Sequence, residues 1–176
     1  MKDVASLAGA ARAEGVDAPL IGSILASNDA HLAHLASAVM AHAPRRVAIV
    51  GVGFKPGASD VRDSAPVRLV HALLDRGVHV AVADAGILDA TVPPLGVDAL
   101  RSALGDPRAH AAASVEEAIR GADVVVVGHP GEADRRALVA LSPLTVPVLD
   151  AAGELSRRLS AEEREVLAPV VVLARR

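Results

Sequence analysis

The chain has 176 residues, 52% of them hydrophobic and 22% charged, which predicts a globular protein that buries one sizeable core. Its formal net charge is −3 and its basic residues are scattered, which argues against nucleic-acid and anionic-membrane binding. No apolar run approaches the ~20 residues that cross a bilayer and no signal peptide is expected, so the cytoplasm is the expected compartment.

Residues 1–43 are predicted to form two helices. Apolar residues recur at helical spacing up to Gly15, and again over a longer run from Leu20 to Val39. The apolar stripe of the second helix is longer than one small domain needs to cover. We therefore expect this region to form a dimer through residues 20–43.

Residues 44–176 are predicted to form a doubly wound, mostly parallel, Rossmann-like α/β domain. Strands are expected at residues 47–51, 79–84, 123–128, 146–150 and 170–173, and helices at residues 66–76, 114–120 and 132–141. Strands separated by helices imply right-handed crossovers and a parallel sheet. Proline and glycine interrupt residues 85–113, where we expect only an edge strand near the end.

The segment after the first strand, residues 51–66, carries the clearest functional signal. It is not a dinucleotide fingerprint, because Pro56 stands where a GxGxxG loop needs its third glycine. A lysine point charge at Lys55 and a guanidinium fork at Arg62 suit phosphate groups and sugar hydroxyls. The alternative is an ordinary loop whose charges face water.

The same segment resembles the signature that opens the C-terminal domain of UDP-glucose and GDP-mannose dehydrogenases. The residues at that family's spacing are Phe54, Lys55, Asp60, Arg62 and Ser64. Asp63 replaces the family's usual glutamate, and Pro66 comes one residue late. Residues 15–28 are similar to the family's central dimerisation region, with Gly22-Ser23 and Ser27-Asn28 closer to the GDP-mannose branch. Residues 123–128 and 149–151 resemble its later strands.

The resemblance implies an activity and roles for individual residues. The family oxidises the sugar C6 alcohol to a carboxylate in two NAD-dependent steps, through a thiohemiacetal and a thioester on a cysteine. Its amino-terminal domain binds NAD, and its C-terminal domain binds the nucleotide sugar, here GDP-mannose or UDP-glucose. By position, Phe54 and Lys55 would contact the nucleotide sugar, and Arg62 would reach toward the cofactor.

The first residues, Met1-Lys2-Asp3, have two interpretations. The family places its catalytic cysteine just before Pro-Lys-Asp, so Asp3 would match the catalytic aspartate and Lys2 its neighbour. Alternatively, these residues are the polar start of a helix, where an aspartate is favoured by the helix dipole.

Three functional hypotheses follow. The first is that the chain is the substrate-binding and dimerising portion of a dehydrogenase whose cysteine and NAD domain come from elsewhere. Because the sequence contains no cysteine, the chain alone is then expected to be inactive. The second is a free-standing nucleotide-sugar-binding or dimerisation module. The third is an independent NAD-binding domain, for which Asp84 is the candidate ribose ligand. The seven histidines are dispersed, so no metal site is expected, and no Ser-His-Asp order supports a hydrolase.

Overall fold

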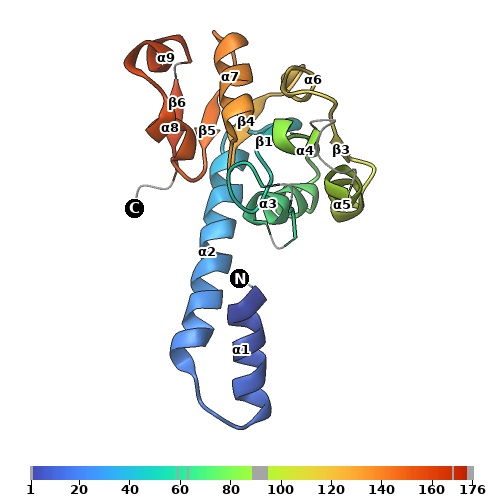
Figure 1. The fold of residues 1–176 in the computed structure, drawn as a ribbon, viewed down its shortest axis with the longest axis vertical. Helices are drawn as coiled ribbons and strands as arrows, with labels where there is room; N and C mark the ends of the chain where they lie inside the picture. Colours follow the sequence, from blue (N-terminus) through green and yellow to red (C-terminus); the bar gives the residue numbers. More distant parts are fainter. Residues whose placement is uncertain (1, 59, 63, 89–94, 168, 174–176) are drawn as a thin grey trace.

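The computed structural model describes residues 2–58, 60–62, 64–88, 95–167 and 169–173. It consists of a helical hairpin that projects from an α/β domain (Figure 1). The hairpin pairs α1 (Lys2–Ala13) with α2 (Pro19–Met40). The turn between them uses Gly15 at φ +68°, and a proline occupies the first turn of α2, where its missing N–H costs nothing.

The α/β domain contains a six-stranded sheet in the order β3-β2-β1-β4-β5-β6, with every pairing parallel. The strands are β1 (Arg46–Val50), β2 (His79–Ala83), β3 (Ala109–Ala111), β4 (Val124–Val127), β5 (Val148–Asp150) and β6 (Val170–Val172). The helices are α3 (Ala65–Leu74), α4 (Ala85–Leu88), α5 (Leu95–Leu104), α6 (Val115–Ile119), α7 (Glu132–Ala140), α8 (Glu154–Arg158) and α9 (Ala161–Val166). The predicted α/β class with a doubly wound parallel sheet is confirmed.

Helices cover both faces of the sheet, which explains why its central strands are apolar without alternation. Val47 and Ile49 of β1 belong to one core, with residues of α2, α3 and α5. Ala48 and Val50 point to the other face and a second core, with residues of α6, α7 and α8. A strand buried on both faces needs apolar side chains at every position.

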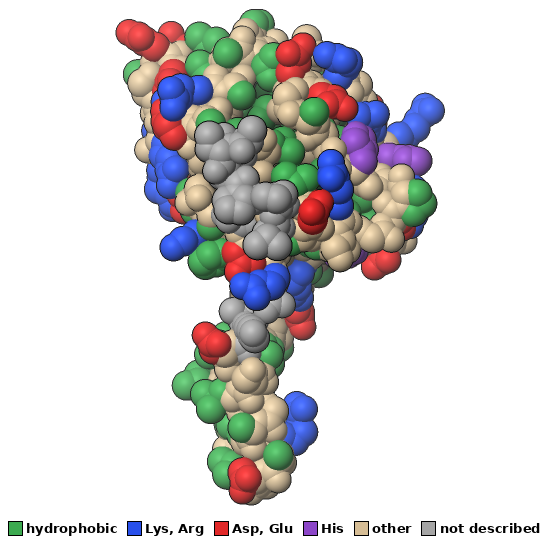
Figure 2. Space-filling view, turned by 45° about the vertical axis from the view of Figure 1, so that its right-hand side comes forward, with side chains coloured by type: hydrophobic (Ala, Val, Ile, Leu, Met, Phe, Trp, Pro, Cys, Tyr) green, Lys and Arg blue, Asp and Glu red, His purple; other side chains and the backbone are tan. Residues whose placement is uncertain are grey.

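The projecting and the buried parts of α2 differ in exposure. Near the sheet, Leu35 and Val39 are buried in the first core. In the hairpin, Leu20 is 74% exposed and Ile24 39% exposed. Figure 2 shows hydrophobic side chains among charged ones on the surface of this projecting part. No described helix is both long and apolar enough to span a membrane.

Two regions hold more structure than the sequence predicted. Residues 85–113 contain α4 and α5 in addition to the expected edge strand, which is β3. The segment after Gly153 contains α8 and α9, which were not predicted. An ion-pair network ties α9 to α7: Arg135 pairs with Glu132 at 2.6 Å and also with Glu163.

Candidate functional site

The candidate site lies at the carboxyl ends of β1 and β4. The chain runs from β1 outward to β2 and β3, then returns to β4 on the other side of β1. Loops that leave two such strands diverge, and ligands of doubly wound sheets bind at this switch point. The β1–α3 loop, residues 51–64, starts here.

Glycine allows the loops after β1 and β4 to meet backbone to backbone. His129 N donates to Gly51 O at 2.9 Å, and Gly128 N donates to Val50 O at 2.9 Å. Gly51 has φ +78°, and a Cβ there would lie 2.6 Å from the carbonyl carbon of His129. A Cβ on Gly128 would lie 2.6 Å from Gly51 O. Only glycine fits this contact without a shift of main chain.

Asp84 fixes the start of the β1–α3 loop from the neighbouring strand. Its side chain is 3% exposed at the end of β2. Oδ2 accepts from Val52 N at 2.9 Å and Gly53 N at 3.0 Å, while Oδ1 accepts from Gly86 N at 3.1 Å and Ile87 N at 3.3 Å. Burial raises the pKa of Asp84, and these four backbone hydrogen bonds act in the opposite direction.

A second buried carboxylate, Asp134, lies beside Asp84. It accepts from Ala85 N at 2.7 Å and from Gly131 N at 2.8 Å, which joins the start of α4 to the start of α7. Burial, and then repulsion from Asp84, raises the pKa of Asp134 to about 6. The fold therefore disfavours the ionised form relative to an exposed aspartate, and Asp134 loses its proton near pH 6 instead of near pH 4.

This raised pKa predicts a pH dependence of stability. Because the folded state holds the Asp134 proton more tightly than the unfolded chain, this group stabilises the fold below about pH 4, and that contribution is lost as the pH rises to about 6. It amounts to roughly 3 kcal/mol. In Asp134→Asn it should vanish. Urea denaturation at pH 4.5 and 7 should show the wild type losing more stability over this interval than the variant; equal losses would contradict the assignment.

Phe54 and Lys55 project from the loop that Asp84 fixes. Phe54 is 48% exposed, and Lys55 Nζ lies 5.3 Å from the centroid of its ring. The backbone beneath them is held by Phe54 N donating to Asp60 O at 2.9 Å and Ala58 N donating to Lys55 O at 3.1 Å. An aromatic face and an ammonium group are therefore presented together by an ordered backbone, an arrangement that suits a base or sugar next to a phosphate.

Arg62 lies further along the same loop, with an 81% exposed side chain. Its guanidinium binds Asp60 through two bonds, from Nε at 3.0 Å and Nη2 at 2.7 Å. Because Phe54 N bonds the carbonyl of the same Asp60, the aspartate connects Phe54 with Arg62. At the end of the loop, the Ser64 hydroxyl donates to Val52 O at 2.6 Å and closes the loop onto its own beginning.

A mainly apolar cavity of about 120 Å³ adjoins this loop. Its walls come from α2, the start of α3 and the ends of β1 and β4, and include Leu35, Pro66 and Gly128. Two histidines also line it, His31 from α2 and His129 from the loop after β4. His129 Nδ1 lies 3.1 Å from Gly53 O, which can only accept, so Nδ1 carries the proton.

His129 was not singled out by the sequence, which showed only dispersed histidines. The available signal was its position two residues after the buried strand β4, at the same sheet edge as Gly51. Phe54, Lys55 and Arg62 are not part of the cavity lining, so loop and cavity are neighbouring features rather than one pocket.

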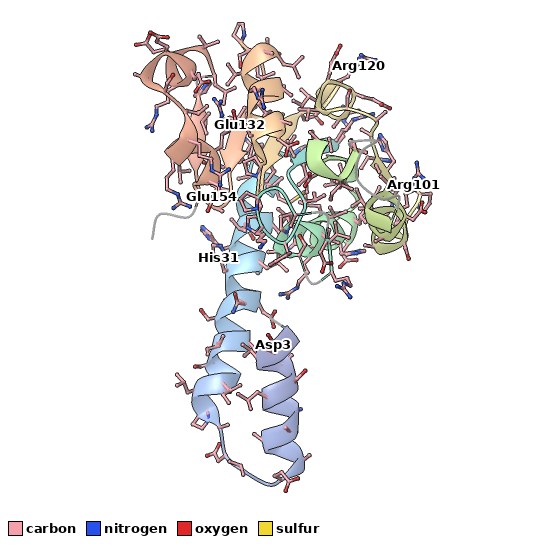
Figure 3. The ribbon with its side chains drawn as sticks, viewed as in Figure 1. Asp3, His31, Arg101, Arg120, Glu132 and Glu154 are labelled. Carbon is pink, nitrogen blue, oxygen red and sulfur yellow. The ribbon has the colours of Figure 1, made fainter. Side chains whose placement is uncertain are left out.

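Asp3 lies in the first turn of α1, at the hairpin end that is nearer the α/β domain (Figure 3). It is exposed and belongs to a different element from the β1–α3 loop. Its position at a helix start is the one that the dipole argument favours. A match to the family's catalytic aspartate stays a prediction.

The described residues of this chain do not form a complete dinucleotide site. Helix α3 begins only at Ala65, well after the end of β1, so its amino terminus does not follow the strand as a pyrophosphate cradle would. Asp84 already accepts four backbone N–H groups, which leaves it unsuited to a ribose. No group of three or more metal-ligating side chains occurs among the residues described.

Comparison with known proteins assigns the family. The UDP-binding domain of the UDP-glucose/GDP-mannose dehydrogenase family matches residues 48–135. A GDP-mannose 6-dehydrogenase of Pseudomonas putida is 30% identical over 163 residues, which are 93% of this chain and 37% of that protein. A UDP-glucose 6-dehydrogenase of Haloferax volcanii is 30% identical over 129 residues, 72% of this chain and 27% of that protein.

Solved structures agree on the fold. A ternary complex of GDP-mannose dehydrogenase from Pseudomonas aeruginosa has a TM-score of 0.73 at 23% identity, over 97% of this chain and 37% of that one. A UDP-glucose dehydrogenase from Pyrobaculum islandicum has a TM-score of 0.68 at 20% identity, over 97% of this chain and 35% of that one. The chain thus spans between 27% and 37% of the length of these dehydrogenases. It belongs to the UDP-glucose/GDP-mannose dehydrogenase family and is homologous to the C-terminal, UDP-binding portion of those enzymes.

Proposed function

We propose that this chain is the nucleotide-sugar-binding and dimerising portion of an NAD-dependent nucleotide-sugar 6-dehydrogenase. Phe54 and Lys55 bind the nucleotide sugar, and Arg62 reaches toward the cofactor. GDP-mannose is the preferred candidate over UDP-glucose, because several relatives with this similarity are GDP-mannose 6-dehydrogenases. The cytoplasm stays the expected compartment.

The observation that supports this most directly is the ordered β1–α3 loop. Asp84 fixes the backbone on one side of Phe54, and the Asp60 carbonyl fixes its amide. The exposed ring and the adjacent ammonium group are then held ready for a ligand at little entropic cost. A diphosphate carries the charge that a lysine binds, and a base or sugar ring covers the aromatic face.

The division of chemistry follows from the residues present. NAD accepts the hydride in such an oxidation, and the chain's own contribution is to bind and orient the nucleotide sugar. Since the 176 residues contain no cysteine, the purified chain is expected not to reduce NAD. This is also the observation that favours the second candidate, a binding module without catalysis. Activity after mixing with a protein that supplies the cysteine and the NAD domain would support the first candidate.

Lys55→Ala should weaken nucleotide-sugar binding by roughly 10- to 100-fold, because it removes one charge-assisted contact worth about 1.5–3 kcal/mol. Calorimetric titrations with GDP-mannose, UDP-glucose and NAD, each alone, measure the effect. NAD is expected not to bind. Arg101→Ala is the matched control, since Arg101 is an exposed cation of α5 outside the loop. Equal affinity of Lys55→Ala and wild type would overturn the role of Lys55.

The hairpin is expected to form a dimer through residues 20–43, because Leu20 and Ile24 expose apolar surface far from the sheet. Leu20→Glu should shift a dimeric sedimentation profile toward monomer. Val166→Glu should not, because Val166 is an exposed apolar residue of α9, outside the hairpin. A monomeric wild-type profile at micromolar concentration would refute dimerisation.

A further inference from the structure

A basic hollow lies at the amino ends of the strands, whereas the β1–α3 loop lies at their carboxyl ends. It has a volume of about 270 Å³ and is formed where β1, β2 and β3 begin. Its polar lining consists of Arg45, Arg46, His79, Arg108 and His110, and its remaining lining is apolar. The lining contains no aspartate or glutamate, and the volume is many times what one water requires.

The strand register places three of these side chains on one face of the sheet. Arg46 lies opposite His79, and Ala81 lies opposite His110. His79 and Ala81 are two residues apart on β2 and so share a face. The amino ends of three adjacent strands therefore present Arg46, His79 and His110 side by side.

The two arginines before and within β1 are not neutralised by ion pairs. None of the ion pairs found within the described part of the chain involves Arg45 or Arg46. The nearby carboxylate, Asp123, uses its Oδ2 for the backbone amides of Arg45 and Arg46, at 2.8 and 2.9 Å. These two hydrogen bonds, followed by attraction to Arg45, lower the pKa of Asp123.

One guanidinium in this cluster is incompletely hydrogen-bonded. Arg46 Nε is buried, and no acceptor lies within hydrogen-bond distance of it among the described residues. A buried donor without an acceptor costs about 1–3 kcal/mol, more when it is charged. Arg108 differs, because it is bound bidentately to Asp106 at 3.1 and 2.7 Å and also donates to Leu74 O. Arg108 therefore forms part of the wall, while Arg45 and Arg46 are the arginines of the hollow that form no side-chain ion pair within the described part of the chain.

We propose that this hollow is a binding site for a small phosphate-bearing molecule, with the phosphate on Arg45 and Arg46 and an N–H donor from each of His79 and His110. Arginine forks match phosphate geometry, and a phosphate bound to the Arg46 guanidinium would supply the negative partner that this group lacks within the described residues. The apolar part of the lining, which includes Val80 and Pro107, leaves room for a small organic group. The site is independent of the nucleotide-sugar function proposed above.

The test is an NMR titration of the whole chain with inorganic phosphate, then AMP, then chloride at matched ionic strength. Phosphate and AMP should shift the Arg46 Nε–H and the ring signals of His79 and His110, and chloride should not. Tighter binding of AMP would place an organic group in the hollow; equal binding would restrict the ligand to the phosphate group. Shifts produced equally by chloride, or no shift with phosphate or AMP, would overturn the site.

Variants separate this site from the β1–α3 loop. The double variant Arg45→Gln/His110→Gln changes two exposed side chains and should weaken phosphate binding at least tenfold without loss of folding. The single variant Arg46→Gln should also weaken phosphate binding at least tenfold without loss of folding. Arg101→Gln, which changes an exposed arginine of α5 outside the lining of the hollow, should leave phosphate binding unchanged. Lys55→Ala should also leave it unchanged, even though that variant loses nucleotide-sugar binding. Unchanged phosphate affinity in both hollow variants would refute the assignment.

Discussion

Gly51→Ala is expected to lower the free energy of unfolding by roughly 3 kcal/mol or more, by two separate effects. The residue has φ +78°, where a side chain costs about 1 kcal/mol or more. In addition, the new Cβ would lie 2.6 Å from the carbonyl carbon of His129 and from Pro130 N. The two loops must move apart to admit it, and overpacking of this kind costs roughly 1–3 kcal/mol.

A matched control isolates the second effect. Gly121 also has a positive φ, +72°, but a Cβ there meets nothing within 4 Å. Gly121→Ala should therefore show the conformational cost alone, about 1 kcal/mol. Urea denaturation of both variants measures the difference, provided that the m-value is unchanged. Equal losses in the two variants would show that the loops after β1 and β4 do not touch as described.

Asp84→Ala is the second large effect, a loss of roughly 3 kcal/mol or more. The N–H groups of Val52, Gly53 and Gly86 lose their side-chain acceptor, while Ile87 N keeps the backbone carbonyl of residue 84, and each unsatisfied donor costs about 1–3 kcal/mol. Part of this loss is offset, because the variant no longer buries a carboxylate, whose burial is unfavourable and raises the pKa of Asp84. Water that enters the vacated space offsets a further part. Since Val52 and Gly53 precede Phe54 directly, nucleotide-sugar affinity should fall as well.

The control for Asp84 is Asp123→Ala. Asp123 likewise accepts two backbone N–H groups, those of Arg45 and Arg46, but it is exposed, so water replaces the carboxylate. Its loss of stability should be about 1 kcal/mol. Hydrogen exchange at Val52 and Gly53 should accelerate in Asp84→Ala and not in Asp123→Ala. Unaltered exchange at those amides would contradict the role of Asp84 in ordering the loop.

The sheet could be predicted closely because its strands are buried on both faces. The apolar run predicted at residues 123–128 is β4, Val124–Val127, and the run at 79–84 is β2, His79–Ala83. The helices α4, α8 and α9 were missed, and each has at most six residues, too few to show a helical period; α6 is as short but was predicted from its Ser-Val-Glu-Glu opening. In α5, Leu100 and Leu104 do carry the period, but prolines and glycines around it obscured the pattern.

The candidate site likewise contains residues that the sequence predicted and residues that it did not. Phe54, Lys55 and Arg62 were predicted as site residues from the resemblance of their segment to the dehydrogenase signature; the structure places them in one loop, and their roles stay predictions. The residues that order the loop come from other strands: Asp84 from the end of β2, and His129 from the loop after β4. Contacts 31 and 76 residues apart depend on the order of strands in the sheet. Asp84 was considered as a ribose ligand, and its four hydrogen bonds assign it to the loop instead.

The meeting of the loops after β1 and β4 also limits how this sequence can diverge. The atoms that exclude a Cβ at Gly51 are a carbonyl carbon and an amide nitrogen, which every amino acid possesses. No exchange of side chain at His129 can therefore act as a suppressor of a mutation at Gly51. At Gly128, in turn, a Cβ would meet the backbone oxygen of Gly51. We therefore expect neither glycine to be replaced during evolution, alone or together with the other.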